Sequence, residues 1–197
     1  IRMAVERHGR PMELTDVDLT RTVGWFTAIH PLRLDTAGVD PLLILKQPDL
    51  LYQYVRRVAW EWRRIPDGGI GYGVLRYLDS TLNQEFGQHP KVEVGFNYLG
   101  RWQNTAEMKQ ALSGVADPSL QLPHTLSVNA ISQGSQENAR LDINWRFAPG
   151  VVSASQIASI ADDFHQAITR LVDLGYSSTS AITLPECKTQ HNITADE

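Results

Sequence analysis

Residues 92–102 read VEVGFNYLGRW, and this stretch decides the fold. Apolar residues alternate with polar or small ones along it, which is the two-residue period of a β-strand. We expect the strand to stop at Gly100, where the backbone can turn. Asn97 and Tyr98 are neighbours near that stop, so their side chains point to opposite faces of the sheet. A polar amide near the end of an apolar strand indicates either a site at the sheet edge or a buried asparagine bonded to nearby backbone.

Two stretches before this strand have extended character. Residues 3–5 form a short apolar run that leads into the sequence ERHGR, residues 6–10. This sequence is typical either of a strand-end loop that presents ionisable groups or of a solvated surface turn. Residues 21–34 contain several β-formers, and Pro31 excludes a helix there. We therefore expect a second extended segment.

The remaining apolar patterns predict helices and a hairpin. Helical spacing covers residues 40–64, with Asp49 as a possible cap, and a second helical pattern covers residues 74–82. Residues 126–130 and 141–147 alternate as strands around a polar stretch, which favours an antiparallel hairpin. A helix follows, with a capping box formed by Ser153 and Gln156 and a stop at Gly175. Its predicted buried stripe is Ile157, Ile160, Ala161, Phe164, Ile168, Leu171 and Val172.

These elements predict an α/β fold in which a layered mixed sheet has flanking helices. Residues 1–176 form the folded part, and residues 177–197 are expected to be a polar tail or linker. The glycine-rich segment PDGGIGYG, residues 66–73, invites comparison with a phosphate-cradling loop. Its glycine spacing does not match the dinucleotide fingerprint, and no Lys-Ser/Thr pair follows. We interpret it instead as a turn that needs positive φ and packs tightly against a neighbour.

Composition narrows the function classes. The chain has 197 residues, of which 42% are hydrophobic and 20% charged, with a formal net charge of -4. This balance, without a basic stripe, argues against a nucleic-acid partner. The single cysteine, Cys187, excludes an internal disulfide framework and a cysteine-based metal site, and it favours a reducing, cytoplasmic setting. The sequence has no apolar run long enough to span a bilayer, so no membrane partner is expected.

Four segments, in order, resemble motifs of the epimerization domains of nonribosomal peptide synthetases. Residues 6–10, ERHGR, resemble EGHGRE, and residues 21–27, RTVGWFT, followed by His30-Pro31, are similar to RTVGWFTxxYP. Residues 66–73, PDGGIGYG, resemble PxxGxGYG, and residues 96–101, FNYLGR, resemble FNYLG. The family belongs to the condensation-domain superfamily and shares the fold of chloramphenicol acetyltransferase. The resemblance implies that residues 1–176 are the C-terminal lobe of a two-lobed domain with its active site between the lobes.

The resemblance also implies an activity. Such a domain inverts the α-carbon, from L to D, of an aminoacyl or peptidyl thioester. The substrate arrives on the phosphopantetheine arm of a peptidyl carrier domain, and no cofactor is bound directly. The implied partners are the carrier domain and the N-terminal lobe, whose HHxxxDG motif supplies a second proton-handling group. That motif does not occur in this sequence, so the lobe alone is expected to be inactive.

Residue roles follow from the same resemblance. Glu6 is one of two acid/base groups, and Asn97 and Tyr98 correspond to positions near the reacting centre. His8 and Arg10 support the glutamate. Trp25 and Tyr72 correspond to residues of the substrate channel. No metal ligand is implied.

The sequence departs from the family pattern at three positions. Arg7 replaces a small residue, Pro11 replaces an acid, and His30 stands where tyrosine is usual. These changes leave open a non-catalytic lobe that only docks carrier domains. A condensation domain that forms peptide bonds shares the fold and is a second alternative. An α/β domain of unrelated function is a third, which the order of the motifs argues against.

Overall fold

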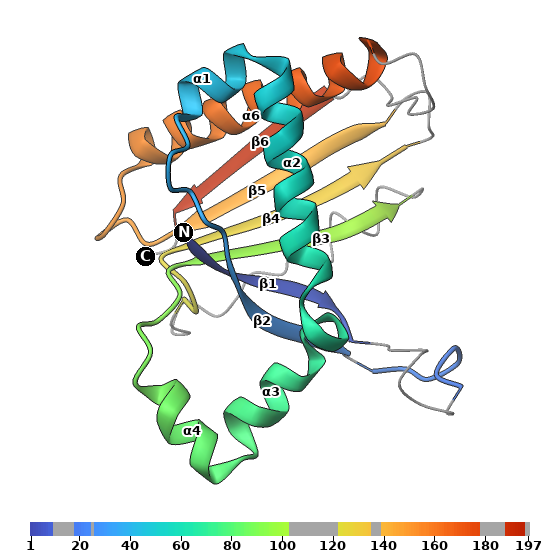
Figure 1. The fold of residues 1–197 in the computed structure, drawn as a ribbon, viewed down its shortest axis with the longest axis vertical. Helices are drawn as coiled ribbons and strands as arrows, with labels where there is room; N and C mark the ends of the chain where they lie inside the picture. The colour runs from blue at the N-terminus through green and yellow to red at the C-terminus, as the bar shows by residue number, and fades with distance from the viewer. Residues whose placement is uncertain (10–17, 25, 103–121, 135–138, 178–187, 196–197) are drawn as a thin grey trace.

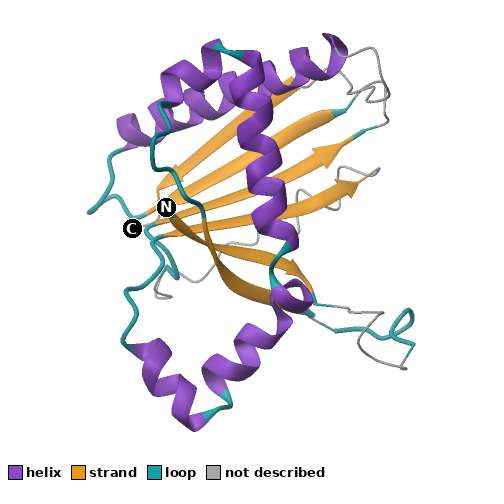
Figure 2. Cartoon of the chain, viewed as in Figure 1, coloured by secondary structure: helices purple, strands orange, loops and turns teal. Residues whose placement is uncertain are grey.

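The computed structural model describes residues 1–9, 18–24, 26–102, 122–134, 139–177 and 188–195. Along the chain, the elements are β1 (Arg2–His8), β2 (Thr27–Arg33), α1 (Pro41–Lys46), α2 (Pro48–Arg63), the 3-10 turn η1 (Pro66–Gly69), α3 (Ile70–Tyr77), α4 (Ser80–Gly87), β3 (Val94–Trp102), β4 (Leu126–Gln133), β5 (Arg140–Phe147), α6 (Ala154–Ser177) and β6 (Lys188–Ala195). Figure 1 shows one twisted sheet with α2 running across it, and α1 and α6 at one end of α2. Figure 2 shows α3 and α4 beyond the β2 edge of the sheet.

The sheet is mixed, as the sequence predicts. Its strand order is β2-β1-β3-β4-β5-β6. Strand β1 runs antiparallel to β2 and parallel to β3, and β3 runs parallel to β4. Strands β4 and β5 form the expected antiparallel hairpin, and β6 pairs parallel to β5. The predicted α/β class, with a layered mixed sheet and flanking helices, is therefore confirmed.

One face of the sheet forms the hydrophobic core. Side chains on alternate positions of β4 and β5, among them Val128, Ile143 and Trp145, pack against Ile157 and Ala161 of α6. Trp145 also contacts Phe164 edge-on, with ring centroids 5.7 Å apart. The two-residue period of each strand places every second side chain on this face and leaves the others for the opposite face.

The N-terminus of α6 has the predicted capping box. Ser153 Oγ accepts the backbone N–H of Gln156 at 3.3 Å, and Gln156 Oε1 accepts the backbone N–H of Ser153 at 2.9 Å. The predicted buried stripe is wrong at Ile160, which is 43% exposed. Asp49 is not the cap of α2 either: it lies in the first turn, and the N-cap is Gln47, with no side-chain bond. Asp40 instead caps α1 and accepts the Leu42 N–H at 2.9 Å.

Two strands run further than the sequence predicts. Strand β3 does not stop at Gly100 but continues to Trp102, because Gly100 at φ 82° permits an irregularity between Tyr98 and Arg101. Strand β1 extends through His8, so Glu6 and His8 lie in a strand and not in a loop. Pro31 lies within β2, where it is tolerated because β2 is an edge strand.

The expectation of a linker from residue 177 is wrong for residues 188–195, which form β6 against β5. The sequence KTQHNITA has no hydrophobic alternation to mark a strand. Main-chain N–H and C=O groups make the pairing, and these groups are present in almost every residue.

The glycine-rich turn after α2 has the conformation that the sequence predicts. Asp67, Gly68 and Gly69 have φ values of 49°, 62° and 87°. A Cβ on Gly69 would lie 1.9 Å from the ring of His30, so the backbone of this turn packs directly against β2.

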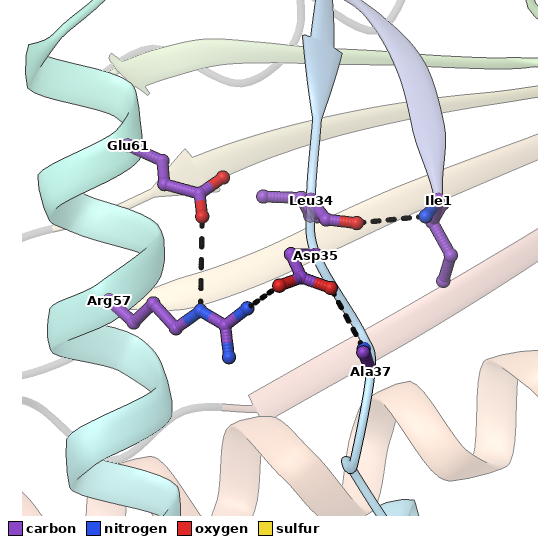
Figure 3. Close-up of polar contacts among 6 residues, drawn as sticks. All are labelled: Ile1, Leu34, Asp35, Ala37, Arg57 and Glu61. Atoms are coloured by element: carbon purple, nitrogen blue, oxygen red, sulfur yellow. Dashed lines mark hydrogen bonds and ion pairs between the residues drawn. The ribbon is translucent and has the colours of Figure 1, made fainter.

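Polar contacts tie α2 to the segment that follows β2 (Figure 3). Asp35 accepts the backbone N–H of Ala37 at 3.0 Å, and its Oδ2 lies 2.6 Å from Arg57 of α2. The pKa of Asp35 is lowered, first by the Ala37 hydrogen bond and also by Arg57. Arg57 lies 3.8 Å from Glu61, one turn further along α2. Beside them, the Ile1 amino group donates to the Leu34 carbonyl at 2.8 Å and joins the start of β1 to the end of β2.

Candidate active site

The face of the sheet opposite the α6 core carries polar side chains in register. Glu6 of β1 is paired with Asn97 of β3, Asn97 with Asn129 of β4, and Asn129 with Asn144 of β5. Paired residues on neighbouring strands point to the same face and lie about 5 Å apart. One carboxylate and three side-chain amides therefore form a row across four strands.

Glu6 and Asn97 are joined directly. The side-chain amide Nδ2 of Asn97 donates to Glu6 Oε2 at 3.0 Å. Both residues are partly buried. Burial raises the pKa of Glu6 above its ordinary value of 4.5, and the positive charge of His124 opposes that rise. A carboxyl group whose pKa lies closer to neutrality is better suited to exchange protons with a substrate.

A cavity of about 340 Å³ opens beside this pair. Its polar lining includes Glu6, Asn97, His124, Asn129 and Arg146. Ala4, Gly95 and Phe96 are among the small or apolar residues that complete it. The cavity offers a carboxylate, amides, an imidazole and a guanidinium to one small polar ligand.

The structure does not bring Tyr98 into this group. Its hydroxyl donates to Ser132 Oγ at 2.9 Å, and the strand alternation places it on the same face as Phe96 and Ala130, opposite Asn97. Tyr98 is half exposed. The sequence correctly assigns Asn97 and Tyr98 to opposite faces, and of the two only Asn97 contacts Glu6.

The other residues assigned by resemblance are dispersed. His8 is exposed, two residues beyond Glu6 on the same face of β1. Tyr72 of α3 packs against Phe86, with centroids 5.5 Å apart, and lines a different cavity of about 670 Å³. Arg10 and Trp25 lie outside the described residues, as does Pro11.

His30 lies on the other face of β2 from the Glu6 site and is 2% exposed. Its Nε2 has no hydrogen-bond partner among the described residues. Its pKa is lowered, chiefly by burial, and the nearby Arg7 charge acts in the same direction. Arg7 lies over the ring of Trp62 at 5.2 Å. Arg7 and His30, two of the departures from the family pattern, therefore both lie near Trp62, and neither lines the Glu6 cavity.

Sequence reasoning missed His124, Asn129, Asn144 and Arg146. The alternation of residues 126–130 and 141–147 predicted their strands, but the row appears only when the strand order and register are known. His124 lies in the segment just before β4, where no periodicity marks it.

Among the described residues, no group of three or more metal-binding side chains comes together. Within the same part of the chain, no helix combines the length and the hydropathy needed to cross a bilayer.

Comparison with known proteins gives a consistent result. The sequence model of the family described as Condensation domain matches residues 1–194. Bacitracin synthase 1 of Bacillus licheniformis is 30% identical over 179 residues, which cover 88% of this chain and 3% of that protein. Surfactin synthase subunit 1 of Bacillus subtilis (strain 168) is 28% identical over 202 residues, which cover 98% of this chain and 5% of the synthase. The chain thus spans a small fraction of these relatives.

A similar solved structure is the epimerization domain from the third module of tyrocidine synthetase B. It superposes with a TM-score of 0.64 at 26% sequence identity. The match covers 88% of this chain and 38% of the other, so more than half of that epimerization domain has no counterpart in these 197 residues.

Proposed function

The chain belongs to the condensation-domain family, and from that premise we propose that it is the C-terminal lobe of an epimerization domain in a nonribosomal peptide synthetase. The complete domain inverts the α-carbon of an aminoacyl or peptidyl thioester held on a carrier domain. The observation that carries the proposal is the 3.0 Å hydrogen bond between Asn97 and Glu6 at the edge of an open cavity. It joins two of the four family motifs in one polar site.

The chemistry suits these residue types. A thioester carbonyl acidifies the neighbouring α-carbon, so a carboxylate can remove its proton without a bound cofactor. Inversion then needs a second acid/base group on the opposite side of that carbon. Glu6 supplies one group, and we assign the other to a histidine of an N-terminal lobe that these 197 residues do not contain.

Asn97 has two roles in this proposal. Its amide holds the Glu6 carboxylate in one orientation. Asn97 also lines the cavity, and in the proposed mechanism its amide donates to the oxygen of the enolate that forms when the α proton leaves. One such donor contributes roughly 3 kcal/mol to transition-state stabilisation in enzymes where it has been removed.

The test is α-hydrogen exchange with solvent. The complete domain is incubated in D₂O with an aminoacyl thioester on its carrier domain, and deuterium at the α-carbon is followed by mass spectrometry. Exchange together with a mixture of L and D product supports the proposal. A complete domain that binds the loaded carrier without exchange is a docking lobe and not an epimerase.

Peptide-bond formation is the second candidate, favoured by the match to the Condensation domain family over residues 1–194. The two activities leave different products. Condensation joins two carrier-bound residues and lengthens the chain, whereas epimerization changes only the configuration of one. Analysis of product length and chirality from one reaction separates them. In either case, we expect these 197 residues alone to show no turnover.

A further inference from the structure

His124 is held in a defined orientation beside the Glu6 site. Its Nδ1 lies 2.9 Å from the backbone carbonyl of Val92. A carbonyl oxygen can only accept, so Nδ1 carries a proton and donates it. Nε2 is then the nitrogen that gains or loses a proton when the ring titrates.

The backbone of β3 makes room for this ring. A Cβ added to Gly95 would lie 2.4 Å from Cδ2 and 3.0 Å from Nε2 of His124. Gly95 is paired with Ala4 of β1, and the next pair on this face is Glu6 with Asn97. Successive residues on one face of a strand are about 7 Å apart, so the ring lies over the pair that adjoins Glu6.

We propose that His124 is a positioning residue for Glu6. The imidazolium of His124, held over Gly95 on the same face of the sheet and lining the same cavity, stabilises the carboxylate of Glu6, which is the form that accepts a proton from the substrate. The electrostatic part concerns this chain alone. The part about substrate rests on the proposed function. The orientation that Val92 and Gly95 impose on the ring is what makes the interaction specific.

The other charged groups near Glu6 are few within the described residues. Arg146 of β5 lines the same cavity, and His8 lies two residues further along the same face of β1. Arg146 keeps its charge throughout the pH range of histidine titration and cannot act as a switch. His8 is exposed, so solvent screens its charge more strongly than that of the partly buried His124.

The experiment follows the Glu6 carboxyl carbon by ¹³C NMR from pH 3 to 9 in the 197-residue chain. In the unmodified chain, we expect the Glu6 signal to show a second inflection at the pH at which the His124 ring titrates. In His124→Gln, that inflection disappears and the Glu6 midpoint moves to higher pH. Gly95→Ala, which displaces the ring without removing it, should move the midpoint in the same direction.

His165→Gln is the matched control, because His165 is exposed on α6, and that helix covers the opposite face of the sheet. His165→Gln should leave both the second inflection and the midpoint of the Glu6 titration curve unchanged. A Glu6 signal without the second inflection in the unmodified chain overturns the proposal, and this readout does not depend on whether any variant folds. An unchanged Glu6 midpoint in folded His124→Gln overturns it as well.

The complete domain gives the second readout. We expect His124→Gln to move the acidic limb of the α-hydrogen exchange profile to higher pH, whereas loss of a purely structural contact would lower exchange equally at every pH. A complete domain with no exchange at any pH defeats the proposed function, yet the NMR coupling of His124 to Glu6 remains measurable. The two failures are thus distinguishable.

Discussion

Asn97 donates its side-chain amide to the carboxylate of Glu6, 91 positions earlier in the chain, at 3.0 Å. The two residues are directly paired across parallel strands β1 and β3. Parallel neighbours need a long connection between them, and here it includes β2 and helices α1 to α4. The proposed site thus depends on the pairing of two strands that are remote in sequence.

Glu6→Gln should lower α-hydrogen exchange in the complete domain by about 10²–10⁴-fold, the usual contribution of a positioned general base. The fold should persist, because glutamine can keep a hydrogen bond with Asn97. Deuterium incorporation at the α-carbon is the measurement. Glu85→Gln, on the exposed surface of α4, is the control and should exchange at the parental rate. Parental exchange in Glu6→Gln would remove this carboxylate from the mechanism.

Asn97→Ala and Tyr98→Phe form a pair of adjacent changes on opposite faces of β3. Loss of the Asn97 donor should reduce exchange by roughly 10²-fold. Tyr98→Phe removes the 2.9 Å bond to Ser132 and should lower the free energy of unfolding by at most about 1 kcal/mol, with exchange unaffected. The measurements are the rate of α-hydrogen exchange and the free energy of unfolding from urea titration, for both variants. Equal losses of exchange in both variants would contradict the assignment of faces.

Gly69→Ala should destabilise the chain by about 1–3 kcal/mol or more, because Gly69 has φ 87° and an added Cβ would meet the His30 ring at 1.9 Å. Gly71→Ala is the matched change two residues later. Gly71 is the second residue of α3, and an added Cβ there would meet no atom within 4 Å beyond its chain neighbours and the backbone of its own helix, so alanine should stabilise the helix by up to about 0.5–1 kcal/mol. Urea unfolding of both variants is the measurement. We expect the free energy of unfolding to fall in Gly69→Ala and to rise in Gly71→Ala.

His30 should make stability depend on pH. Burial lowers its pKa below the ordinary 6.5, so it stays neutral in the folded chain while the unfolded chain takes up a proton. The unfolded state then binds more protons below about pH 6.5, and the free energy of unfolding falls as pH drops through that range. Above about pH 6.5, the contribution of neutral His30 to the free energy of unfolding is fully present. Urea titrations from pH 5.5 to 7.5 should show this slope, with a flatter one in His30→Gln than in the parent or in His165→Gln. Parallel curves for all three chains would mean that His30 titrates alike in both states.

Local patterns in the sequence determined much of this protein. The alternation in residues 92–99 predicted a strand, the Ser153–Gln156 pair predicted the start of α6, and the glycines of residues 66–73 predicted positive φ with close packing. The capping box is a contact between residues that are near in the chain, and positive φ is a property of the glycines themselves. The motif order, in addition, indicated the family and directed attention to Glu6 and Asn97.

Tertiary structure alone decided which of those residues meet. The strand order and register brought Glu6 to Asn97, left Tyr98 on the other face and placed His124 over Gly95. In the tertiary structure, residues 188–195 also form an edge strand, which no hydrophobic pattern in the sequence predicts. The physical reason is the same in each case. Strand pairing is made by main-chain hydrogen bonds that are common to all sequences, so the identity of a strand's neighbour is set by how the whole chain buries its apolar face.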